Sequence, residues 1–569
     1  MRKQTKIAAL VSATALLALG ASITSFAAAR GTWMLVDGEW YCYDSNGDPY
    51  EDTFCVSNGK DYYVGEDGML VRSSWVDYDG DMYFVNSAGQ KITSDWRLTT
   101  PYDDEDAEEE WYYFQASGKM ATNKKIVYKG NTYFFDADGK MLTGWVTAEG
   151  DDVVNEENDI DPDHTFYADE TGARVEEDWI YTVEPSTAED DADADYYYYY
   201  LLPSGKVATG KRNNIKGQTY LFDKDNYTML SGWVRGEVNE DGKTVYTAID
   251  GEDDNIPIVN DPEAKYTYYY CSGADDGHVK KDRWIKTWRP ADTYEEDEDV
   301  DQFWYWIESD GKIFVPSNSD ADKVAAEKWK LEDGELVIKA NYDGVTKKKV
   351  NSKDYFFNEN GEMLSEFLYV LEDSKDLKEG LYYFGGSDDG SMKTGAETIK
   401  DDNLDSFKFY FETKGENKGV GITGNKSNKL YYMGHLVAAQ DYRYQPVTID
   451  VKEKVKVAGT DNVYEYVINE YTFIVNSNGT IQHSTVEYKE DGDVLIDASE
   501  LDKSDFVSSG AYKYALTKTG LKKLVDKISV EYLDPTQVMA VASSVADAVE
   551  SADNAKNPVA DDTTGNEQN

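Results

Sequence analysis

Pairs of large aromatic side chains are the feature of this sequence that points most directly to chemistry. A Trp, Tyr or Met often stands just before a short aromatic triplet, and a second Trp precedes it along the chain. Two or three aromatic faces that meet between neighbouring repeats form a box for a cation, and a quaternary ammonium fits best because its methyl groups are poorly hydrated. The candidate cage residues are Trp33 with Trp40, Trp75 with Met82, Trp96 with Trp111, Trp179 with Tyr198, Trp233 with Tyr268, and Trp284 with Trp304. A Trp that only fills the groove between repeats is an equally good interpretation at any single site.

Residue patterns for catalysis or metal binding are missing from the sequence. The four histidines are far apart and lack metal-ligand spacing. The segment from Gly236 to Thr244 resembles a phosphate loop, but it has one residue too many and three acidic side chains. A catalytic domain would need a non-repetitive stretch of sequence, and the only candidate, about 441–545, still contains weak copies of the repeat. We therefore expect a noncatalytic protein with no metal or other cofactor.

The triplets belong to a repeated unit, because a step of 21 residues separates Tyr41 from Tyr62 and Tyr62 from Tyr83. Alternating aromatic residues favour a β-strand, and the Gly-containing stretch that follows favours a turn. We expect each unit to be a β-hairpin made of the triplet, that turn and a short second strand such as 140–142. The triplets begin at Tyr41, Tyr62, Tyr83, Tyr112, Tyr133, Phe166, Tyr199, Tyr220, Tyr269, Tyr305, Tyr355, Tyr382, Phe409 and Tyr431, with weaker copies at Phe473 and Tyr514.

One hairpin cannot bury its apolar face alone, so the units must stack on one another. The sequence predicts an all-β solenoid of stacked β-hairpin repeats, with long acidic loops between repeats and a short helical, then disordered, C-terminal tail. The first and third residues of each triplet are nearly always apolar and are expected to form the core face. The residue before the triplet varies widely in type, which indicates an exposed position.

The charge balance limits the possible partners. The chain has 569 residues, with 57 Lys and Arg against 110 Asp and Glu, a net charge of −53. Such a polyanion repels phosphate, which excludes nucleic acid and anionic membrane surfaces as partners. An aromatic content of 14% is nevertheless unlike that of a disordered chain. Acidic insertions lie between repeats, in 103–110, 151–163 and 189–195 among others, and most of the acid is expected in such loops.

The termini and the composition indicate five regions. A basic start, an apolar run and small residues up to Ala29 predict a signal peptide at 1–29, hence a secreted protein without membrane insertion. The remaining regions are 30–310 with Trp-rich repeats, 311–440 with Trp-poor repeats, 441–523 with degenerate repeat-like β-structure, and 524–569 with a helical and then disordered acidic tail. Helix-compatible spacing covers 521–528 and 537–549. Three cysteines are too few for a disulfide framework, and Cys42 and Cys55 either pair across hairpins or are buried as small apolar residues.

The phrase from Asn131 to Trp145, NTYFFDADGKMLTGW, resembles the choline-binding, or cell-wall-binding, repeat of Gram-positive surface proteins. Residues 31–47 and 230–233 match the same pattern. The resemblance implies a hairpin solenoid attached noncovalently to choline on cell-wall teichoic acid, and related repeats of glucan-binding proteins and clostridial toxins hold carbohydrate. Thr132 and Thr219 depart from the pattern because they stand where a cage needs an aromatic. All 13 Trp lie at or before Trp329, so ligand binding is expected within 31–310.

The sequence thus favours a noncatalytic protein of the cell wall or extracellular surface that holds choline or similar groups on a wall glycopolymer. Two alternatives stay open: a carbohydrate-binding adhesin that uses the same grooves, and an acidic surface polymer without a specific ligand. The sequence does not separate choline from sugar and leaves the oligomeric state open.

Overall fold

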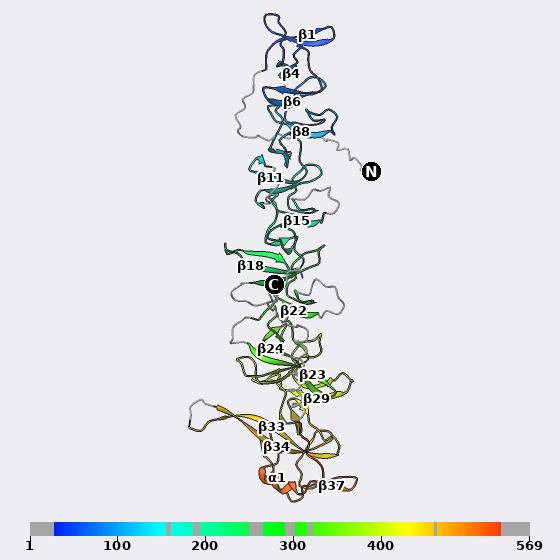
Figure 1. The fold of residues 1–569 in the computed structure, drawn as a ribbon, viewed down its shortest axis with the longest axis vertical. Helices are drawn as coiled ribbons and strands as arrows, with labels where there is room; N and C mark the ends of the chain where they lie inside the picture. Colours follow the sequence, from blue (N-terminus) through cyan, green and yellow to red (C-terminus); the bar gives the residue numbers. More distant parts are fainter. Residues whose placement is uncertain are drawn as a thin grey trace, which may run out of the picture. The chain divides into compact units, whose positions relative to one another are not determined.

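The computed structural model describes residues 28–154, 161–185, 194–249, 266–290, 302–316, 323–459 and 464–535 (Figure 1). The predicted signal peptide up to residue 27, the predicted helix at 537–549 and the acidic tail lie outside these residues. Within them, strands dominate and the only α-helix is α1 (Lys518–Val525), which confirms the all-β prediction. No described helix is long and apolar enough to cross a membrane.

Antiparallel hairpins are the repeating element, and every predicted triplet from Tyr41 to Tyr431 lies on or overlaps the second strand of one. The chain divides into two compact units, the first containing residues up to Arg212 with 222–229, and the second containing 213–221 and the residues from Leu230 onward. The hairpin strands of the first unit are β1 (Thr32–Val36) and β2 (Glu39–Tyr43), β3 (Thr53–Ser57) and β4 (Lys60–Val64), β5 (Ser74–Tyr78) and β6 (Asp81–Val85), β7 (Asp95–Thr99) and β8 (Glu110–Phe114), β9 (Lys124–Tyr128) and β10 (Asn131–Phe135), β11 (Gly144–Glu149) with β12 (Asp152–Val153) and β13 (Thr165–Ala168), and β14 (Asp178–Thr182) and β15 (Tyr197–Leu201).

The second unit continues with hairpins and then with larger sheets. Strands β25-β24-β23-β26-β27 form one five-stranded sheet, and β28-β29-β32-β31-β30 form another. Its strands are β18 (Gly232–Val238), β19 (Thr244–Ala248), β20 (Thr267–Cys271), β21 (Arg283–Thr287), β22 (Phe303–Ile307), β23 (Val324–Glu332), β24 (Glu335–Val350), β25 (Lys353–Phe357), β26 (Phe367–Val370), β27 (Gly380–Tyr383), β28 (Gly395–Lys400), β29 (Ser406–Phe411), β30 (Gly424–Lys426), β31 (Lys429–Tyr432), β32 (His435–Leu436), β33 (Tyr444–Lys456), β34 (Tyr464–Asn476), β35 (Ile481–Gln482), β36 (Glu487–Glu490) and β37 (Asp493–Asp497). Strands β16 (Lys211–Ile215) and β17 (Gln218–Leu221) lie where the chain passes between the units.

In the compact hairpins the tight turn precedes the triplet, whereas the sequence pattern predicted it after the triplet. In β9–β10, Lys129 and Gly130 have φ of 50° and 92°, and Asp37 and Gly38 of β1–β2 have 52° and 98°. Positive φ at both central residues defines the two-residue turn whose twist matches that of paired strands. The strand before the triplet, which carries the first Trp of each pair, is therefore the main partner of the triplet strand.

The segment that follows each triplet connects neighbouring hairpins. Met141 makes only an isolated bridge to Phe135, and its backbone N–H donates to the carbonyl of Trp111, 2.9 Å away. The same bond recurs along the chain, and we call the donating residue the joint residue. The joint residues and the acceptors that precede the triplets are Leu70 with Trp40, Lys91 with Asp61, Met120 with Met82, Met141 with Trp111, Arg174 with Thr132, Met229 with Tyr198, Val279 with Thr219, Ile313 with Tyr268, Met363 with Trp304, and Met392 with Asp354.

Both faces of the triplet strands are buried, although only the first and third residues were expected in the core. In β8, Tyr112, Tyr113 and Phe114 are 0%, 8% and 0% exposed. The middle residue is covered because it lies on the same face as the Trp of its own hairpin, as Tyr113 lies opposite Trp96. That Trp in turn contacts the next hairpin, since the Trp96 ring is 5.4 Å from the Phe135 ring. Neighbouring hairpins thus stack on one another through contacts between aromatic rings.

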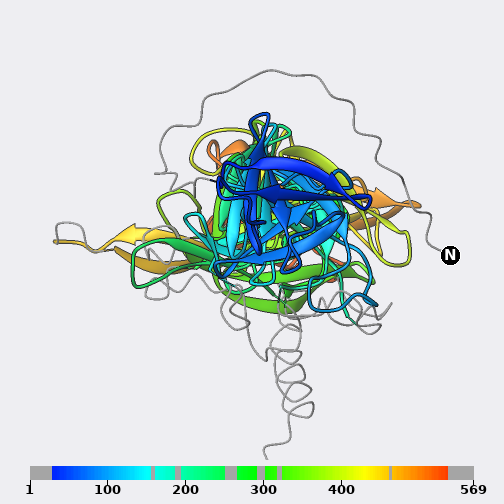
Figure 2. The ribbon, with the colours of Figure 1, turned by 90° about the horizontal axis from the view of Figure 1, so that it is seen from above.

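The 441–523 region departs from the repeat. Strands β33 and β34, of 13 residues each, form a hairpin that projects from the rest of the second unit (Figure 2). Phe473 lies in a strand as predicted, but Tyr514 lies in a turn with φ of 76°, so the predicted copy there is wrong. The glycine that follows this triplet, Gly520, lies inside α1, which begins after the capping residue Thr517 and covers most of the predicted helix at 521–528.

The three cysteines are buried and form no disulfide, so the possible Cys42–Cys55 bridge is not made. Cys42, Cys55 and Cys271 are each 0% exposed, and Cys42 and Cys55 belong to one core cluster with Val64. Burial raises the pKa of the Cys42 thiol.

Candidate functional site

Each candidate aromatic cage combines four positions of two successive hairpins. The best example contains Trp96 of β7, Trp111 of β8, Tyr133 of β10 and the joint residue Met141. The Trp96 ring lies 6.3 Å from that of Trp111 at 85°, and 4.9 Å from that of Tyr133 at 71°. Met141 packs in the same cluster as Trp96 and Tyr133. The rings of Trp96, Trp111 and Tyr133 and the Met141 thioether therefore gather at this joint.

Strand register explains why the two tryptophans converge. Trp96 lies opposite Tyr113, and Leu98 lies opposite Trp111. Opposed residues of an antiparallel pair point to the same side, as do residues two apart on one strand. Trp96 and Trp111 therefore share a face despite 14 intervening residues, most of which form an acidic insertion. Trp111 remains 37% exposed, which leaves its ring open to a ligand.

The predicted pair of Trp33 and Trp40 has the same design. The ring of Trp33 lies 5.8 Å from that of Tyr62 in the next hairpin, at 70°. Leu70 is the joint residue, and its N–H donates to the Trp40 carbonyl at 2.9 Å. Trp40 is 38% exposed, so this cage also presents an open indole.

Trp284 and Trp304 line a larger cavity in the second unit. The ring of Trp284 lies 4.8 Å from that of Tyr355, and these three rings and the joint residue Met363 line a cavity of about 670 Å³. Other lining residues are Lys353 and the loop Gly386, Ser387, Asp388 and Asp389.

The loop of this cavity is held by polar contacts. The indole N–H of Trp304 donates to Asp388 Oδ1 at 3.0 Å, and Lys286 pairs with the same oxygen at 2.8 Å. Lys286 holds the pKa of the Asp388 carboxyl below its usual range. The cavity therefore combines aromatic walls with charged groups, unlike the cage at Trp96.

At three joints the first tryptophan is covered by the following hairpin. Trp75 Nε1 donates to the Thr100 carbonyl at 2.9 Å, Trp145 Nε1 to Val183 at 2.9 Å, and Trp233 Nε1 to Trp288 at 3.1 Å. Each acceptor immediately follows the first strand of the next hairpin. The backbone at that point therefore closes the joint over the indole.

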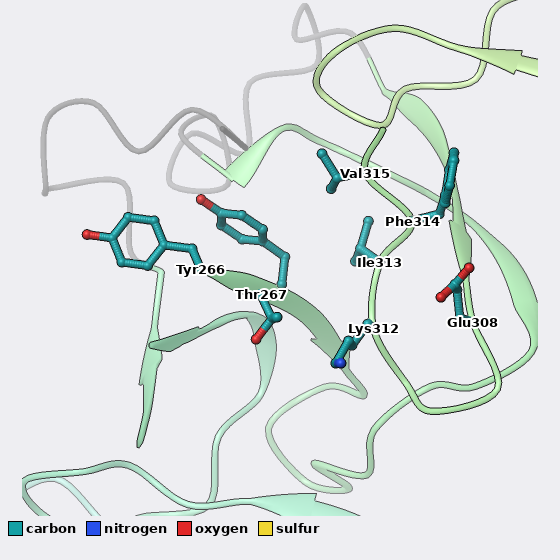
Figure 3. A pocket seen from close by; sticks show the side chains of 8 residues that line it. Tyr266, Thr267, Glu308, Lys312, Ile313, Phe314 and Val315 are labelled. Carbon is teal, nitrogen blue, oxygen red and sulfur yellow. The ribbon is translucent and has the colours of Figure 1, made fainter. Parts of the chain in front are cut away.

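Two of these closed joints contain predicted cage pairs. Trp75 contacts the rings of Tyr112 at 4.8 Å and Tyr102 at 5.9 Å, and it packs with Met82 in one cluster. Trp233 and Tyr268 are 1% and 3% exposed, so both are core residues here. The N–H of the joint residue Ile313 donates to the Tyr268 carbonyl at 2.8 Å, and both residues line a cavity of about 200 Å³. Ile313, Phe314 and Val315 form part of that lining (Figure 3).

The remaining predicted pair, Trp179 with Tyr198, is brought onto one face of its hairpin. Trp179 lies opposite Tyr200, and Tyr181 lies opposite Tyr198. The ring of Trp179 is 5.1 Å from that of Tyr200, whereas Tyr198 contacts Tyr181 at 4.6 Å. Each ring thus has an aromatic neighbour within its own hairpin, and Trp179 also stacks on Phe222 of the next hairpin at 5.9 Å.

Two of the four candidate cage positions were not predicted from the sequence. Tyr62, Tyr133 and Tyr355 were expected in the core because they begin triplets; Tyr355 is buried as expected, and each of the three rings also contacts the first Trp of a candidate cage. The joint residue, which follows the triplet's turn, was not predicted either. A Leu or Met two residues after the turn glycine, as at Leu70 and Met141, is the sequence signal that identifies it.

Described residues hold no group of three or more His, Cys, Asp or Glu placed to bind a metal ion. His435 illustrates why these histidines are poor candidates. Its ring lies 5.0 Å from that of Phe409 and 5.8 Å from that of Phe407, and burial lowers its pKa to about 4.

Comparison with known proteins confirms the predicted resemblance, because residues 105–144 match the choline-binding repeat. That segment contains Trp111, Tyr133 and Met141 of the best-formed cage. Glucosyltransferase-S of Streptococcus mutans is 25% identical over 222 residues, which are 39% of this chain and 13% of that protein. Glucosyltransferase-I of Streptococcus downei is 22% identical over 417 residues, 70% of this chain and 24% of that protein. The chain thus spans about a quarter or less of the length of these curated relatives.

Among solved structures, choline-binding protein F of Streptococcus pneumoniae is similar, with 18% identity and a TM-score of 0.28. That match covers 68% of this chain and 98% of that protein. The choline-binding domain of CbpL from the same organism has 21% identity and a TM-score of 0.27, covering 44% of this chain and 96% of that domain.

Proposed function

We propose that this protein attaches noncovalently to choline or similar quaternary ammonium groups on a cell-wall glycopolymer. The groups bind in the cages centred on Trp40, Trp111 and Trp304. One observation carries the proposal: Trp111 stands 37% exposed at right angles to Trp96, with Tyr133 completing the box. Exposed indoles of this kind need a binding partner to explain them, which disfavours a polymer without a ligand.

The physical basis is the attraction between a cation and the faces of aromatic rings. Each contact contributes about 0.5–1 kcal/mol at an exposed site and up to about 2 kcal/mol when water is excluded. The net charge of −53 raises the concentration of cations near the chain. Several cages on one chain also strengthen attachment to a polymer that carries many identical groups, since later contacts form at high effective concentration.

The proposal makes the protein a noncatalytic binder on the outer side of the cell. The predicted signal peptide supports this location. The match of residues 105–144 to the choline-binding repeat supports the ligand.

Retention of the full chain on an immobilised tertiary amine, followed by elution with free choline, tests the proposal. We expect retention and release by choline, and weaker retention for Trp40→Ala combined with Trp111→Ala. Tyr466→Ala is the matched control, because it removes a 54%-exposed ring from β34, outside every cage. Flow-through of a folded chain would refute the choline ligand.

Glycan binding is a second candidate function for the cavity at Trp304. Its volume of about 670 Å³ suits a ligand larger than one choline group, and Lys353 and Asp389 add hydrogen-bonding groups beside the rings. The glucosyltransferase relatives are consistent with a carbohydrate ligand. Binding to a glycan panel that is lost on Trp304→Ala and kept on Trp111→Ala would assign this cavity to sugar.

A further inference from the structure

The joint between hairpins β3–β4 and β5–β6 contains a lysine where the open cages have Leu or Met. The Lys91 N–H donates to the Asp61 carbonyl at 2.8 Å, just as Met141 donates to Trp111. All four cage positions therefore have counterparts here. Phe54 corresponds to Trp96, Asp61 to Trp111, Tyr83 to Tyr133, and Lys91 to Met141.

The ammonium group of Lys91 lies inside this box. Its Nζ is 4.9 Å from the centre of the Phe54 ring and 5.6 Å from that of Tyr83. Asp61 Oδ2 is 2.7 Å from Nζ and supplies the counter-ion. The Lys91 side chain is only 13% exposed, and Phe54 and Tyr83 are 5% and 4% exposed. A cation with two aromatic walls and a carboxylate already occupies the position that a ligand would take.

The aliphatic part of the Lys91 side chain is also held in place by the turn of the following hairpin. A Cβ atom added at Gly118 would lie 2.8 Å from Cδ of Lys91, so the next turn packs directly on the stem. Gly139 packs in the same way on Met120, with the corresponding distance to Sδ being 2.5 Å. Lys91 is therefore held in the joint like an apolar joint residue and is not a freely moving surface lysine.

We propose that this joint is a cation-binding site whose occupant is the ammonium of Lys91. The intact joint takes no external ligand, and loss of the ammonium uncovers a site for a small quaternary or tertiary ammonium ion with Asp61 as its counter-ion. At joints that the backbone of the next hairpin does not close, the joint residue then decides whether a ligand can bind: Leu70 and Met141 leave their cages open, and Lys91 fills its own. This inference does not depend on ligand binding at the other cages.

Lys91→Met in the full chain tests the proposal, because Met is the residue at the equivalent joint position 141. Tetramethylammonium is the probe, titrated by calorimetry into the wild type and the variants. We expect Lys91→Met to bind one more equivalent than the wild type. The control Lys91→Arg keeps a cation in the joint and should bind the same number as the wild type. Asp61→Asn added to Lys91→Met should weaken the gained site.

A folded Lys91→Met variant that binds no additional equivalent would overturn the proposal. Should the variant be too unstable to titrate, its melting temperature is compared in tetramethylammonium chloride and in sodium chloride at equal ionic strength. We expect tetramethylammonium to raise the melting temperature of Lys91→Met more than that of the wild type, and an equal response would reject the site. A wild type without any binding, beside a variant with one equivalent, would refute the proposed function alone.

Discussion

Replacing a turn glycine by alanine should show how tightly successive repeats are fitted together. Gly361 and Gly47 occupy the same turn after their triplets, with φ of 75° and 88°. A Cβ atom at Gly361 would overlap the carbonyl oxygen of Phe314, whereas one at Gly47 would meet nothing within 4 Å. The two substitutions therefore share the backbone cost and differ in the overlap with the neighbouring repeat.

The expected costs follow from these two terms. A left-handed conformation costs alanine about 1–2 kcal/mol, which applies to both variants. Overlap with a backbone atom cannot be relieved by a rotamer change, and overpacking of this kind costs a further ~1–3 kcal/mol. We thus expect Gly47→Ala to lower the free energy of local unfolding by about 1–2 kcal/mol and Gly361→Ala by about 2–5 kcal/mol.

Hydrogen exchange measures these costs residue by residue, which suits a repeat protein whose parts open separately. The reporter for Gly361→Ala is the N–H of Met363, bonded to the Trp304 carbonyl at 2.8 Å, and the reporter for Gly47→Ala is the N–H of Tyr50, bonded to Cys42 at 2.7 Å. Equal losses of protection in the two variants would show that the repeats are not in tight contact at Gly361. The reasoning would then be wrong.

Three further predictions concern single side chains. Trp111→Ala should weaken binding of a quaternary ammonium at its cage by roughly 2- to 30-fold, the equivalent of 0.5–2 kcal/mol, without changing the melting temperature, and a calorimetric titration checks both. Trp233→Ala should leave ammonium binding unchanged and lower the free energy of unfolding by about 3–5 kcal/mol in denaturant titration, because this ring is 1% exposed. Because burial lowers the pKa of His435 to about 4, stability gained from its neutral form is present above the unfolded pKa of about 6.5 and is lost as pH falls toward 4. His435→Phe should remove up to about 3 kcal/mol of this pH dependence in melts between pH 7 and 4, and identical profiles for the two proteins would contradict it.

Local patterns were enough to predict most of the fold. Aromatic triplets at a step of 21 residues identified strands correctly from Tyr41 to Tyr431, since stacked hairpins bury such residues whatever lies in the loops. The hairpin partner was misassigned because two turn signals flank each triplet and glycine suits both. The copy at Tyr514 failed because an isolated short motif fits a turn before a helix as well as a strand.

The cages were harder to predict than the fold. Pairing of Trp96 with Trp111 follows from alternation along a strand, and their rings do meet. Whether a joint is open depends on the carbonyl that follows the next hairpin's first strand, as at Thr100 over Trp75. No residue type predicts this hydrogen bond, because it joins residues 25 positions apart and depends on the conformation of the chain between them.

The joint hydrogen bond also explains how this chain tolerates long, acidic insertions between its repeats. The bond joins residues 30 apart at Trp111 and Met141, but 59 apart at Trp304 and Met363, with the same distance to within 0.1 Å. Doubling the length of a flexible loop costs only about 0.6 kcal/mol of closure entropy. In the longer span the additional residues include β23 and most of β24, so they lie between successive hairpins, and the joint bond forms around them unchanged. The repeats form a fixed frame in which loop length and composition are free to diverge.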